Sequence, residues 1–323
     1  MFSLTIDQAK GLAILLVVLG HISSPAGTFI FSFHMPLFFF LAGIFIKTSY
    51  SSREYLAKGV ERLIVPFLIF GALGLFATFI KDILLHRPLE PLQESLTGLL
   101  FWADTNHMHH YGFVLWFLPA LFWGRIFIFL SVKHLQWHPA ILVGASVIVA
   151  WLSAQYLTLP WGLDKALVAL PWIMMGAVFN RYLDRWLSSG WQGVSALGIL
   201  FVLLIYAGGM QRLDLANKDI GNLLLSVPYT LSVVLLLIGL LYQCNVYSTP
   251  KIKGATDVLV LFGQNTMLVM VLHVYTNNAA DIVDNHFLGS GYWLITFFLS
   301  VALIFIFIQI KRRYADSLVF KYL

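Results

Sequence analysis

Three residues in the first apolar segment, Asp7, Lys10 and His21, carry groups that transfer protons or bind anions. An α-helix turns by about 100° per residue, so the step from Lys10 to His21 ends within roughly 20° of its starting direction. Asp7 lies three residues before Lys10, so the three side chains form one stripe along a helix. An ionisable group within an apolar span is costly and is by default a candidate functional group. An imidazole with an ordinary pKa near 6.5 also suits proton removal at neutral pH, so one intramembrane histidine is a candidate general base.

Each residue of the stripe also has a structural interpretation. Lys10 can extend its ammonium group to lipid headgroups, Asp7 can serve as a helix-start residue, and His21 can lie at the interface near the helix end. The three residues share one stripe, and further histidines are expected near the same external edge. We therefore favour a functional role, in which Asp7 pairs with Lys10 as an i,i+3 neighbour.

Two further histidines, His34 and His273, are expected beside His21, because a short connection and the end of a later span bring them to the same edge. Histidine pairs suggest zinc, but no Asp or Glu accompanies them at ligand spacing and the sequence HExxH is absent. The cluster of His107, His109 and His110 suggests metal by composition only, and a solvated loop explains it better. The single cysteine, Cys244, excludes a cysteine-based metal site and a disulfide framework. We therefore expect no metal.

The elements that must position these residues are membrane helices. Of the 323 residues, 59% are hydrophobic and 11% are charged, and the mean hydropathy is +0.84. Soluble domains carry roughly 25% charged residues, so a soluble enzyme, a disordered chain and a nucleic-acid-binding domain are excluded. The apolar runs predict an all-α integral membrane protein, a bundle of about ten transmembrane helices. The predicted spans are 4–22, 28–46, 62–80, 112–131, 140–158, 164–180, 191–210, 220–243, 256–275 and 290–310, with the sixth and ninth the weakest.

The distribution of basic residues predicts the orientation of the chain, because Lys and Arg concentrate in cytoplasmic loops. With ten spans and a cytoplasmic N-terminus, five of the 20 Lys and Arg residues lie outside, and the other fifteen lie on the cytoplasmic side. The five outside are Lys81, Arg87, Lys165, Arg212 and Lys218. Both termini are therefore predicted to be cytoplasmic. The formal charge of +5 reflects this topology more than an anionic partner.

The chain is predicted to form a single membrane-embedded domain over residues 1–323. No linker divides it, and we find neither an inverted repeat nor broken helices in matching positions, the features of many transporters. The N-terminus lacks the basic region and the cleavage site of a signal peptide.

Five blocks in order along the chain resemble the acyltransferase-3 family of integral membrane acyltransferases, in the branch related to fucose 4-O-acetylase and other sugar O-acetyltransferases. The first is Lys10, ten further residues, and His21. The others are FHMPLFFFLAG at 33–43, RLIVP at 62–66, LWFLP at 115–119, and GQNT at 263–266 followed by His273. Two positions depart from the family pattern: Gly59 stands where a second Arg is common before Arg62, and Ala42 stands where Ser is common.

The resemblance implies an enzyme that moves an acyl group from cytosolic acyl-CoA to a hydroxyl group of a glycan or lipid-linked saccharide. His21 would be the catalytic histidine and Lys10 its basic partner. The donor, expected to be acetyl-CoA, would place its phosphates against cationic residues at the cytoplasmic mouth. Those donor-binding candidates are Lys10, Lys58 and Arg62. The acceptor-side candidates are His34, Trp116, Asn265 and His273.

We therefore predict an O-acyltransferase of the bacterial cytoplasmic membrane that acts on an extracytoplasmic polysaccharide or its precursor. Its partners would be acyl-CoA, the glycan acceptor and membrane lipids, without nucleic acid. Direct transfer with His21 as base and a covalent acyl-histidine intermediate both stay open. The alternative is a proton-coupled transporter or flippase for a glycan precursor, since intramembrane Lys and His occur there too. A non-catalytic sensor leaves the stripe unexplained.

Overall fold

The computed structural model describes residues 1–105, 107–108, 111–135, 137–289, 291–314 and 322–323. These residues form helices and contain no strand; two of them, Asp214 and Asp219, form an isolated bridge. The contacts group the chain into two compact units, which are described in turn. The single domain predicted over 1–323 stays a prediction.

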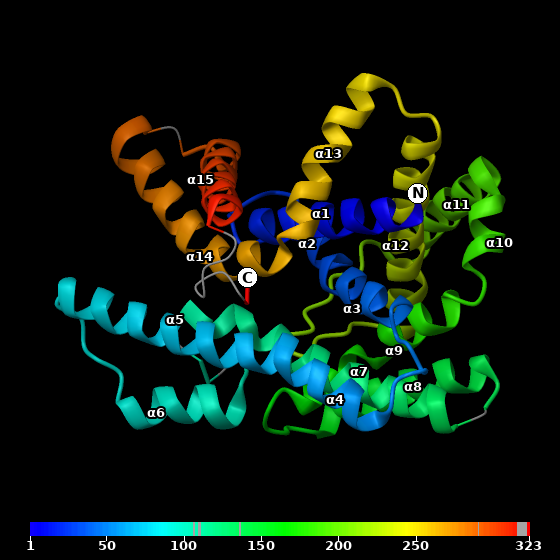
Figure 1. Ribbon diagram of the computed structural model, residues 1–323, viewed down its shortest axis with the longest axis horizontal. Helices are drawn as coiled ribbons and strands as arrows, with labels where there is room; N and C mark the ends of the chain where they lie inside the picture. The colour runs from blue at the N-terminus through cyan, green and yellow to red at the C-terminus, as the bar shows by residue number, and fades with distance from the viewer. Residues whose placement is uncertain (106, 109–110, 136, 290, 315–321) are drawn as a thin grey trace. The chain divides into compact units, whose positions relative to one another are not determined.

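The first unit comprises residues 1–38, 183–212 and 224–323. Figure 1 shows its helices by label. They are α1 (Phe2–Gly20), α2 (Gly27–Phe31), the first residues of α3 (His34–Ile44), α10 (Leu183–Ser188), α11 (Gly190–Gly208), α12 (Leu223–Val246), α13 (Pro250–Gln264), α14 (Thr266–Val283), the π-helical η4 (Asp284–Leu288) and α15 (Trp293–Arg313).

Helices α1 and α13 cross at two glycines, Gly11 and Gly263. A Cβ atom on Gly11 would lie 1.8 Å from the carbonyl oxygen of Leu259, and one on Gly263 would lie 1.8 Å from that of Asp7. Small residues let two membrane helices approach closely enough for backbone contact. This crossing holds the Asp7–Lys10 end of α1 against the end of α13.

Polar side chains also tie α1 to α12. The Asn245 amide donates to Gln8 Oε1 at 2.7 Å, and the Gln8 amide donates to Asn245 Oδ1 at 2.9 Å. Gln8 is fully buried. An amide buried in apolar surroundings is costly without a partner, so this reciprocal pair fixes the position of α1 along α12.

Helices α13 and α14 meet at Asn265 with a bend of 89°. Asn265 leaves the helical conformation, with φ −118° and ψ 27°, and its side-chain amide donates to the carbonyl oxygen of Leu261 at 2.8 Å. This bond satisfies a carbonyl that the interrupted helix leaves without a backbone donor. The ninth span predicted at 256–275 is therefore interrupted at Asn265, and the bent pair α13–α14 stands in its place.

The second unit comprises residues 39–182 and 213–223. It contains the remainder of α3, α4 (Ser52–Gly59), the π-helical η1 (Val60–Ile64), α5 (Val65–Leu84), α6 (Leu92–Thr97), the π-helical η2 (Gly98–Trp102), the 3-10 helix η3 (Tyr111–Trp116), α7 (Phe117–His134), α8 (Pro139–Tyr156) and α9 (Leu163–Phe179). Segments α4, η1 and α5 run on as one helix from Ser52 to Leu84, which begins where Ser51 accepts from the Glu54 amide.

Within this unit α3 crosses α9 at another glycine pair, Gly43 and Gly176. A Cβ atom on Gly43 would lie 2.0 Å from the Ile173 carbonyl oxygen, and one on Gly176 would lie 2.0 Å from that of Phe40. The small residues of the FFFLAG segment therefore serve close helix packing, as is typical of small residues in membrane helices.

Nearly every predicted span coincides with a helix that can cross a bilayer. Eight helices among the described residues are long and apolar enough, and the bent pair α13–α14 makes nine if it counts as one span. The sixth predicted span, 164–180, corresponds to α9, whose 17 residues are at the lower limit for crossing about 30 Å of hydrocarbon. The second predicted span, 28–46, contains both α2 and α3, and residues 27–44 together are long and apolar enough to cross a bilayer.

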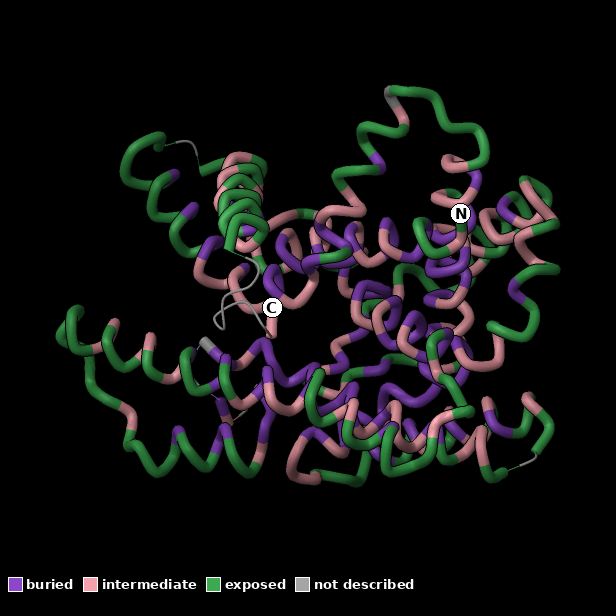
Figure 2. Tube along the Cα trace, viewed as in Figure 1, coloured by how far each residue is buried: buried purple, intermediate pink, exposed green. Residues whose placement is uncertain are grey.

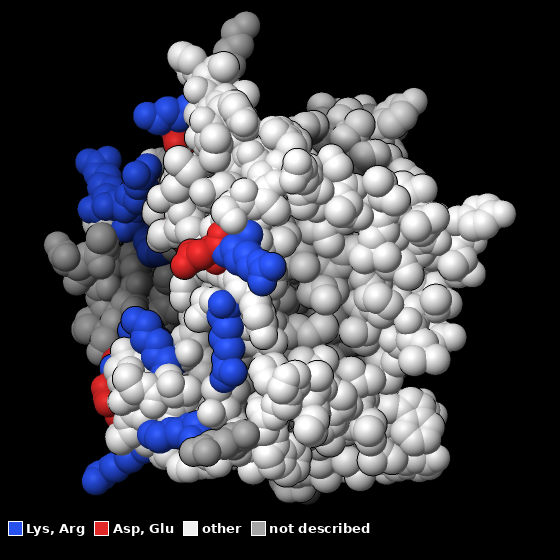
Figure 3. All heavy atoms as spheres, turned by 90° about the vertical axis from the view of Figure 1, so that its right-hand side faces the viewer, with Lys and Arg blue, Asp and Glu red and all other residues white. Residues whose placement is uncertain are grey.

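The surface of the helices is apolar where a soluble protein would be polar. Helix α11 buries only Val194 of its 19 residues, although it is strongly apolar, and Figure 2 shows most of the tube there as exposed or intermediate. Large parts of the face in Figure 3 carry no charged side chain. Exposed apolar surface of this extent requires lipid around it. The protein is a multi-pass integral membrane protein.

Candidate functional site

The Asp7–Lys10 pair forms as the helix spacing predicts. Lys10 Nζ lies 3.2 Å from Asp7 Oδ1, and both side chains are about a quarter to a third exposed, at 24% for Asp7 and 32% for Lys10. Because Gly263 packs on the backbone at Asp7 and Gly11, this pair lies at the end of α13, near the break at Asn265. Part of the lysine charge is thus accessible to a ligand.

His21 follows the last residue of α1 and caps the helix, with its side chain exposed. The imidazole ring of His273, on α14, lies with its centroid 5.0 Å from that of His21. His273 is completely buried, whereas His21 faces outward. The structure therefore places His21, at the end of the first helix, beside His273, which follows about 250 residues later in the chain.

The tautomer of His273 follows from its hydrogen bond. Its Nδ1 lies 2.8 Å from the carbonyl oxygen of Met270. A carbonyl oxygen only accepts, so Nδ1 carries the proton and the neutral ring keeps a lone pair on Nε2. That Nε2 atom is buried and has no hydrogen-bond partner among the described residues. A buried acceptor of this kind, beside an exposed histidine, is suited to receive a hydrogen bond during a reaction.

His34, the first residue of α3, is buried and fixed in the same way, with Nδ1 2.7 Å from the Ile30 carbonyl oxygen. The ring of Phe31 connects it to His21: its centroid lies 5.0 Å from that of His34 and 6.4 Å from that of His21. The guanidinium carbon of Arg212 lies 5.0 Å from the same phenyl centroid. The His21 end of the stripe thus contains three histidines, His21, His34 and His273, and the exposed cation of Arg212.

Asn265 lies at the break between α13 and α14, where its side-chain oxygen accepts from Lys311 Nζ at 2.7 Å. The sequence analysis used Lys311 only as a marker of orientation. Its position directly after the predicted span 290–310, in the last turn of the apolar helix α15, is a signal that would have identified it. The Asp7–Lys10 end of α1 and the Lys311–Asn265 pair both belong to the first unit.

The other predicted site residues, Lys58, Arg62 and Trp116, belong to the second unit. Lys58 is exposed and pairs with Glu54 at 2.8 Å, and its ammonium lies 3.9 Å from the Tyr50 ring centroid. Arg62 is exposed in the π-helical segment η1. Trp116, in contrast, is 7% exposed and ends η3. The roles of these three residues stay predictions.

The second unit also holds a buried charge cluster that the sequence analysis missed. Lys165 Nζ lies 3.1 Å from Asp104 and 3.6 Å from Asp164, and all three side chains are at most 3% exposed. Lys218 completes it at 3.2 Å from Asp164. Lys165 and Lys218 had been counted only as external charges. The two adjacent ionisable residues that begin an otherwise apolar helix, Asp164 and Lys165, were the available signal.

Asp104 also accepts from His107, whose Nδ1 lies 2.8 Å from its carboxylate. Burial by itself raises the pKa of Asp104, but the hydrogen bond from His107 and the charge of Lys165 outweigh it, so the pKa is lowered. His109 and His110, which the sequence analysis placed in a solvated loop, lie outside the described residues. No group of three or more His, Cys, Asp or Glu side chains suited to a metal ion occurs in the described part of the chain.

Comparison with known proteins identifies the family. The model of the acyltransferase domain of the acyltransferase-3 family matches residues 4–309, which include α1, the bent pair α13–α14 and all predicted site residues. No curated protein and no solved structure shows a significant match to the chain. The match extends over nearly the whole sequence, and the chain therefore belongs to the acyltransferase-3 family and is a membrane acyltransferase.

Proposed function

We propose that the protein transfers an acetyl group from cytosolic acetyl-CoA to a hydroxyl group of an extracytoplasmic or lipid-linked polysaccharide, with His21 as the catalytic base. The observation that carries this proposal is the pairing of exposed His21 with buried His273, whose Nε2 lone pair has no partner among the described residues. An exposed base oriented by a buried partner is the arrangement that general-base catalysis of acyl transfer requires. We place the protein in the bacterial cytoplasmic membrane, in the branch of the sugar O-acetyltransferases.

In this mechanism His21 removes the proton of the acceptor hydroxyl as its oxygen attacks the thioester carbonyl. The tetrahedral intermediate then collapses, the carbon–sulfur bond breaks, and the CoA thiolate takes the proton back from His21. His273 accepts a hydrogen bond from the His21 ring and stabilises the imidazolium that forms. An acyl-histidine intermediate on His21 is the other balanced route, and the same His273 contact would orient it.

Lys10 and Lys311 are the cations at the other end of α1. The rise from Lys10 to His21 is about 16 Å along the helix, so a long thioester arm bound near Lys10 would reach toward His21. We propose Lys10 as a ligand of the donor phosphates and Asn265 as a donor to the bound chain. Lys58 and Arg62 remain sequence-based candidates for the phosphates. His34 would orient the acceptor hydroxyl, and Trp116 remains a sequence-based candidate for the acceptor.

The first test is release of CoA by purified protein in lipid nanodiscs, supplied with acetyl-CoA and the lipid-linked saccharides extracted from its source cells. His21→Ala should lower the rate by a factor of about 10²–10⁴, the contribution of a positioned general base. His134→Ala, which alters an exposed histidine at the end of α7, is the matched control and should retain full activity.

Both variants must keep the melting temperature of the unaltered protein for the comparison to count. Full CoA release by a folded His21→Ala protein would refute the assignment. Mass spectrometry of surface glycans from cells with and without the protein should show loss of one acetyl mass per modified residue; a different lost mass would replace acetyl as the transferred group.

A further inference from the structure

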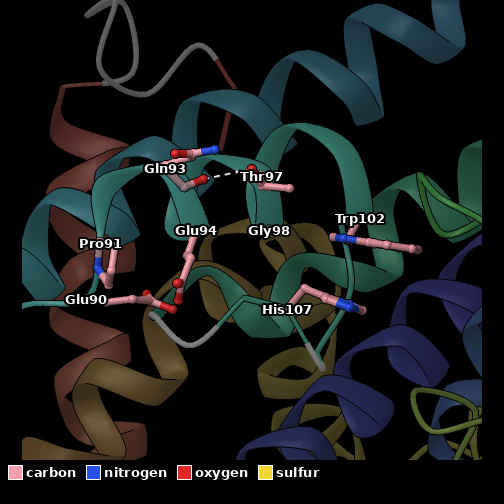
Figure 4. A pocket seen from close by; sticks show the side chains of 8 residues that line it. All are labelled: Glu90, Pro91, Gln93, Glu94, Thr97, Gly98, Trp102 and His107. Carbon is pink, nitrogen blue, oxygen red and sulfur yellow. Dashed lines mark hydrogen bonds between the residues drawn. The ribbon is translucent and has the colours of Figure 1, made fainter.

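A pocket of about 430 Å³ opens in the second unit, and none of the predicted site residues is among the described residues that line it. Figure 4 shows its lining residues, which come from the connection before α6, from α6 itself, from η2 and from the loop after η2. Pockets for small molecules measure about 300–1,000 Å³, so this one is large enough for one or two sugar rings but oversized for a single ammonium group.

Two carboxylates, Glu90 and Glu94, form one end of the pocket. Glu90 is held in place by the Ser95 hydroxyl, which donates to its Oε2 at 2.6 Å. Glu94 is exposed on the first turn of α6. The carboxylates of these two glutamates can accept strong hydrogen bonds from hydroxyl or ammonium groups.

Two aromatic rings, Trp102 and His107, form the other end. They are stacked, with centroids 4.3 Å apart and planes 11° from parallel. His107 donates from Nδ1 to Asp104, which leaves Nε2 as a further polar atom at this end of the pocket. The indole of Trp102 supplies a flat apolar surface.

The aromatic end is anchored by the buried charge cluster. Asp104 accepts from both the ring and the backbone amide of His107, and Lys165 holds Asp104 in turn. The floor is packed as well, since a Cβ atom on Gly98 would lie 1.9 Å from the His107 carbonyl oxygen. Because these supports are buried and paired, the pocket keeps its shape without a ligand.

The lining selects the chemistry of the ligand. Its carboxylates are acceptors, and the Thr97 hydroxyl already donates to the Gln93 carbonyl. No Lys or Arg is among the described residues that line the pocket, so these residues offer no cation to a phosphate-rich molecule such as the acyl donor. A ligand that presents several hydroxyl donors and one apolar face matches both ends.

We propose that this pocket binds a neutral saccharide unit of the acyl acceptor, with its hydroxyl groups on Glu90 and Glu94 and its C–H face on Trp102. The identity of the saccharide as acceptor rests on the proposed function; the binding of the saccharide itself does not. The pocket would therefore select which glycan is acylated.

Saturation-transfer NMR on the full-length protein in nanodiscs tests the proposal, with the methyl glycosides of glucose, galactose, mannose, rhamnose and N-acetylglucosamine as probes. At least one glycoside should show saturable transfer to its ring protons. Glu94→Gln should weaken that binding about tenfold, because it removes the charge from one hydrogen bond, and Trp102→Ala should abolish it. Trp137→Ala, which changes an exposed tryptophan outside the pocket, is the matched control and should bind normally.

The outcomes separate the two proposals. Binding in the wild-type protein that persists in both Glu94→Gln and Trp102→Ala would overturn the pocket assignment, as would no binding of any glycoside. Binding of choline alone would replace the saccharide by an organic cation held against Trp102. His21→Ala should still bind the glycoside while it loses CoA release. Saccharide binding without any CoA release in the wild-type protein would refute the proposed function and leave the pocket standing.

Discussion

At the scale of single residues, the environment of His273 is unusual because the two nitrogens of one ring have opposite surroundings. Nδ1 donates to Met270, while Nε2 is buried without a partner among the described residues. A buried acceptor that lacks a donor costs roughly 1–3 kcal/mol, a cost that a catalytic role would explain. Trp172 Nε1 and Tyr229 Oη are also buried without a hydrogen-bond partner among the described residues, but the ring of His21 lies beside that of His273 and not beside either of these rings.

The variant His273→Asn tests the roles of the two ring nitrogens separately. An asparagine amide can replace the Nδ1 donor to Met270 but has no group at the position of Nε2. We expect CoA release to fall about 10–100-fold, because the acceptor at Nε2 is lost, while the protein stays folded through the retained hydrogen bond to Met270. Steady-state rates and thermal melts of the same preparation measure both effects. Unchanged activity in a folded His273→Asn protein would leave His273 a packing residue.

The lowered pKa of Asp104 predicts a pH dependence of stability. The carboxylate is favoured in the folded protein by His107 and Lys165, so its pKa there is below the unfolded value near 3.9. The stabilisation of the folded protein by the Asp104 carboxylate is therefore present above about pH 4 and is lost as the pH falls through the folded pKa.

Asp104→Asn should lower stability by about 1–3 kcal/mol between pH 5 and 7, the loss of a charge-assisted hydrogen bond. Thermal melts in nanodiscs from pH 7 to pH 3 should show this difference shrinking below about pH 4. Asp281→Asn, which alters an exposed carboxylate on α14, serves as the control. A difference that stays constant down to pH 3 would contradict the ionised state of Asp104 as its cause.

At the scale of elements, the crossing of α1 and α13 positions the stripe of Asp7, Lys10 and His21. Gly11 and Gly263 bring the two backbones into contact beside Asp7 and Lys10, and the bend at Asn265 then directs α14 so that His273 meets His21. The Asn277 amide adds a further tie, donating to the carbonyl oxygen of Val18 at 3.0 Å one turn before His21. The geometry of the histidines thus depends on backbone packing at a distance from them.

Gly263→Ala tests this dependence. Its Cβ would lie 1.8 Å from a backbone oxygen, which cannot move as a side chain does, so α13 must shift away from α1. We expect the free energy of unfolding to fall by about 1–3 kcal/mol, which lowers the melting temperature, and we expect CoA release to be at least tenfold slower.

The matched control is Gly254→Ala on the same helix, where a new Cβ meets nothing within 4 Å. It should leave both stability and activity unchanged. Equal effects from the two substitutions would indicate that loss of glycine itself, and not the crossing, is responsible.

At the scale of the whole molecule, the path of the chain through the membrane follows from the positive-inside bias and from the bend at Asn265. If the pair α13–α14 is one bent span, the residues before α13 and after α14 lie on opposite sides. If it is a re-entrant loop, they lie on the same side, and the C-terminus moves to the outside.

Cysteine labelling distinguishes the two topologies, and the sole cysteine makes it direct, since Cys244→Ala yields a cysteine-free protein. In that background Arg87→Cys and His286→Cys should react with a membrane-impermeant maleimide in intact cells. Arg53→Cys and Lys253→Cys should react only after permeabilisation. Equal labelling of positions 253 and 286 from one side would establish a re-entrant loop and overturn the predicted C-terminal orientation.

The sequence by itself determined the class of the protein and the composition of its first helix. Long apolar runs permit only a membrane location, and the regular turn of a helix fixes the Asp7–Lys10 pair and its alignment with His21 without any other part of the chain. The resemblance that the ordered motifs suggested is confirmed by the family match over residues 4–309.

The tertiary structure decided which distant residues meet. The break at Asn265, the partnership of His21 with His273 and the burial of Lys165 between Asp104 and Asp164 each depend on packing between segments far apart in sequence. Hydropathy averages over such features, so Lys165 and Lys311 were read as markers of orientation although both make specific polar contacts. The physical reason is that helix formation follows from local backbone geometry, whereas the neighbour of a side chain follows from close approach of helices, which residues such as Gly11 and Gly263 permit.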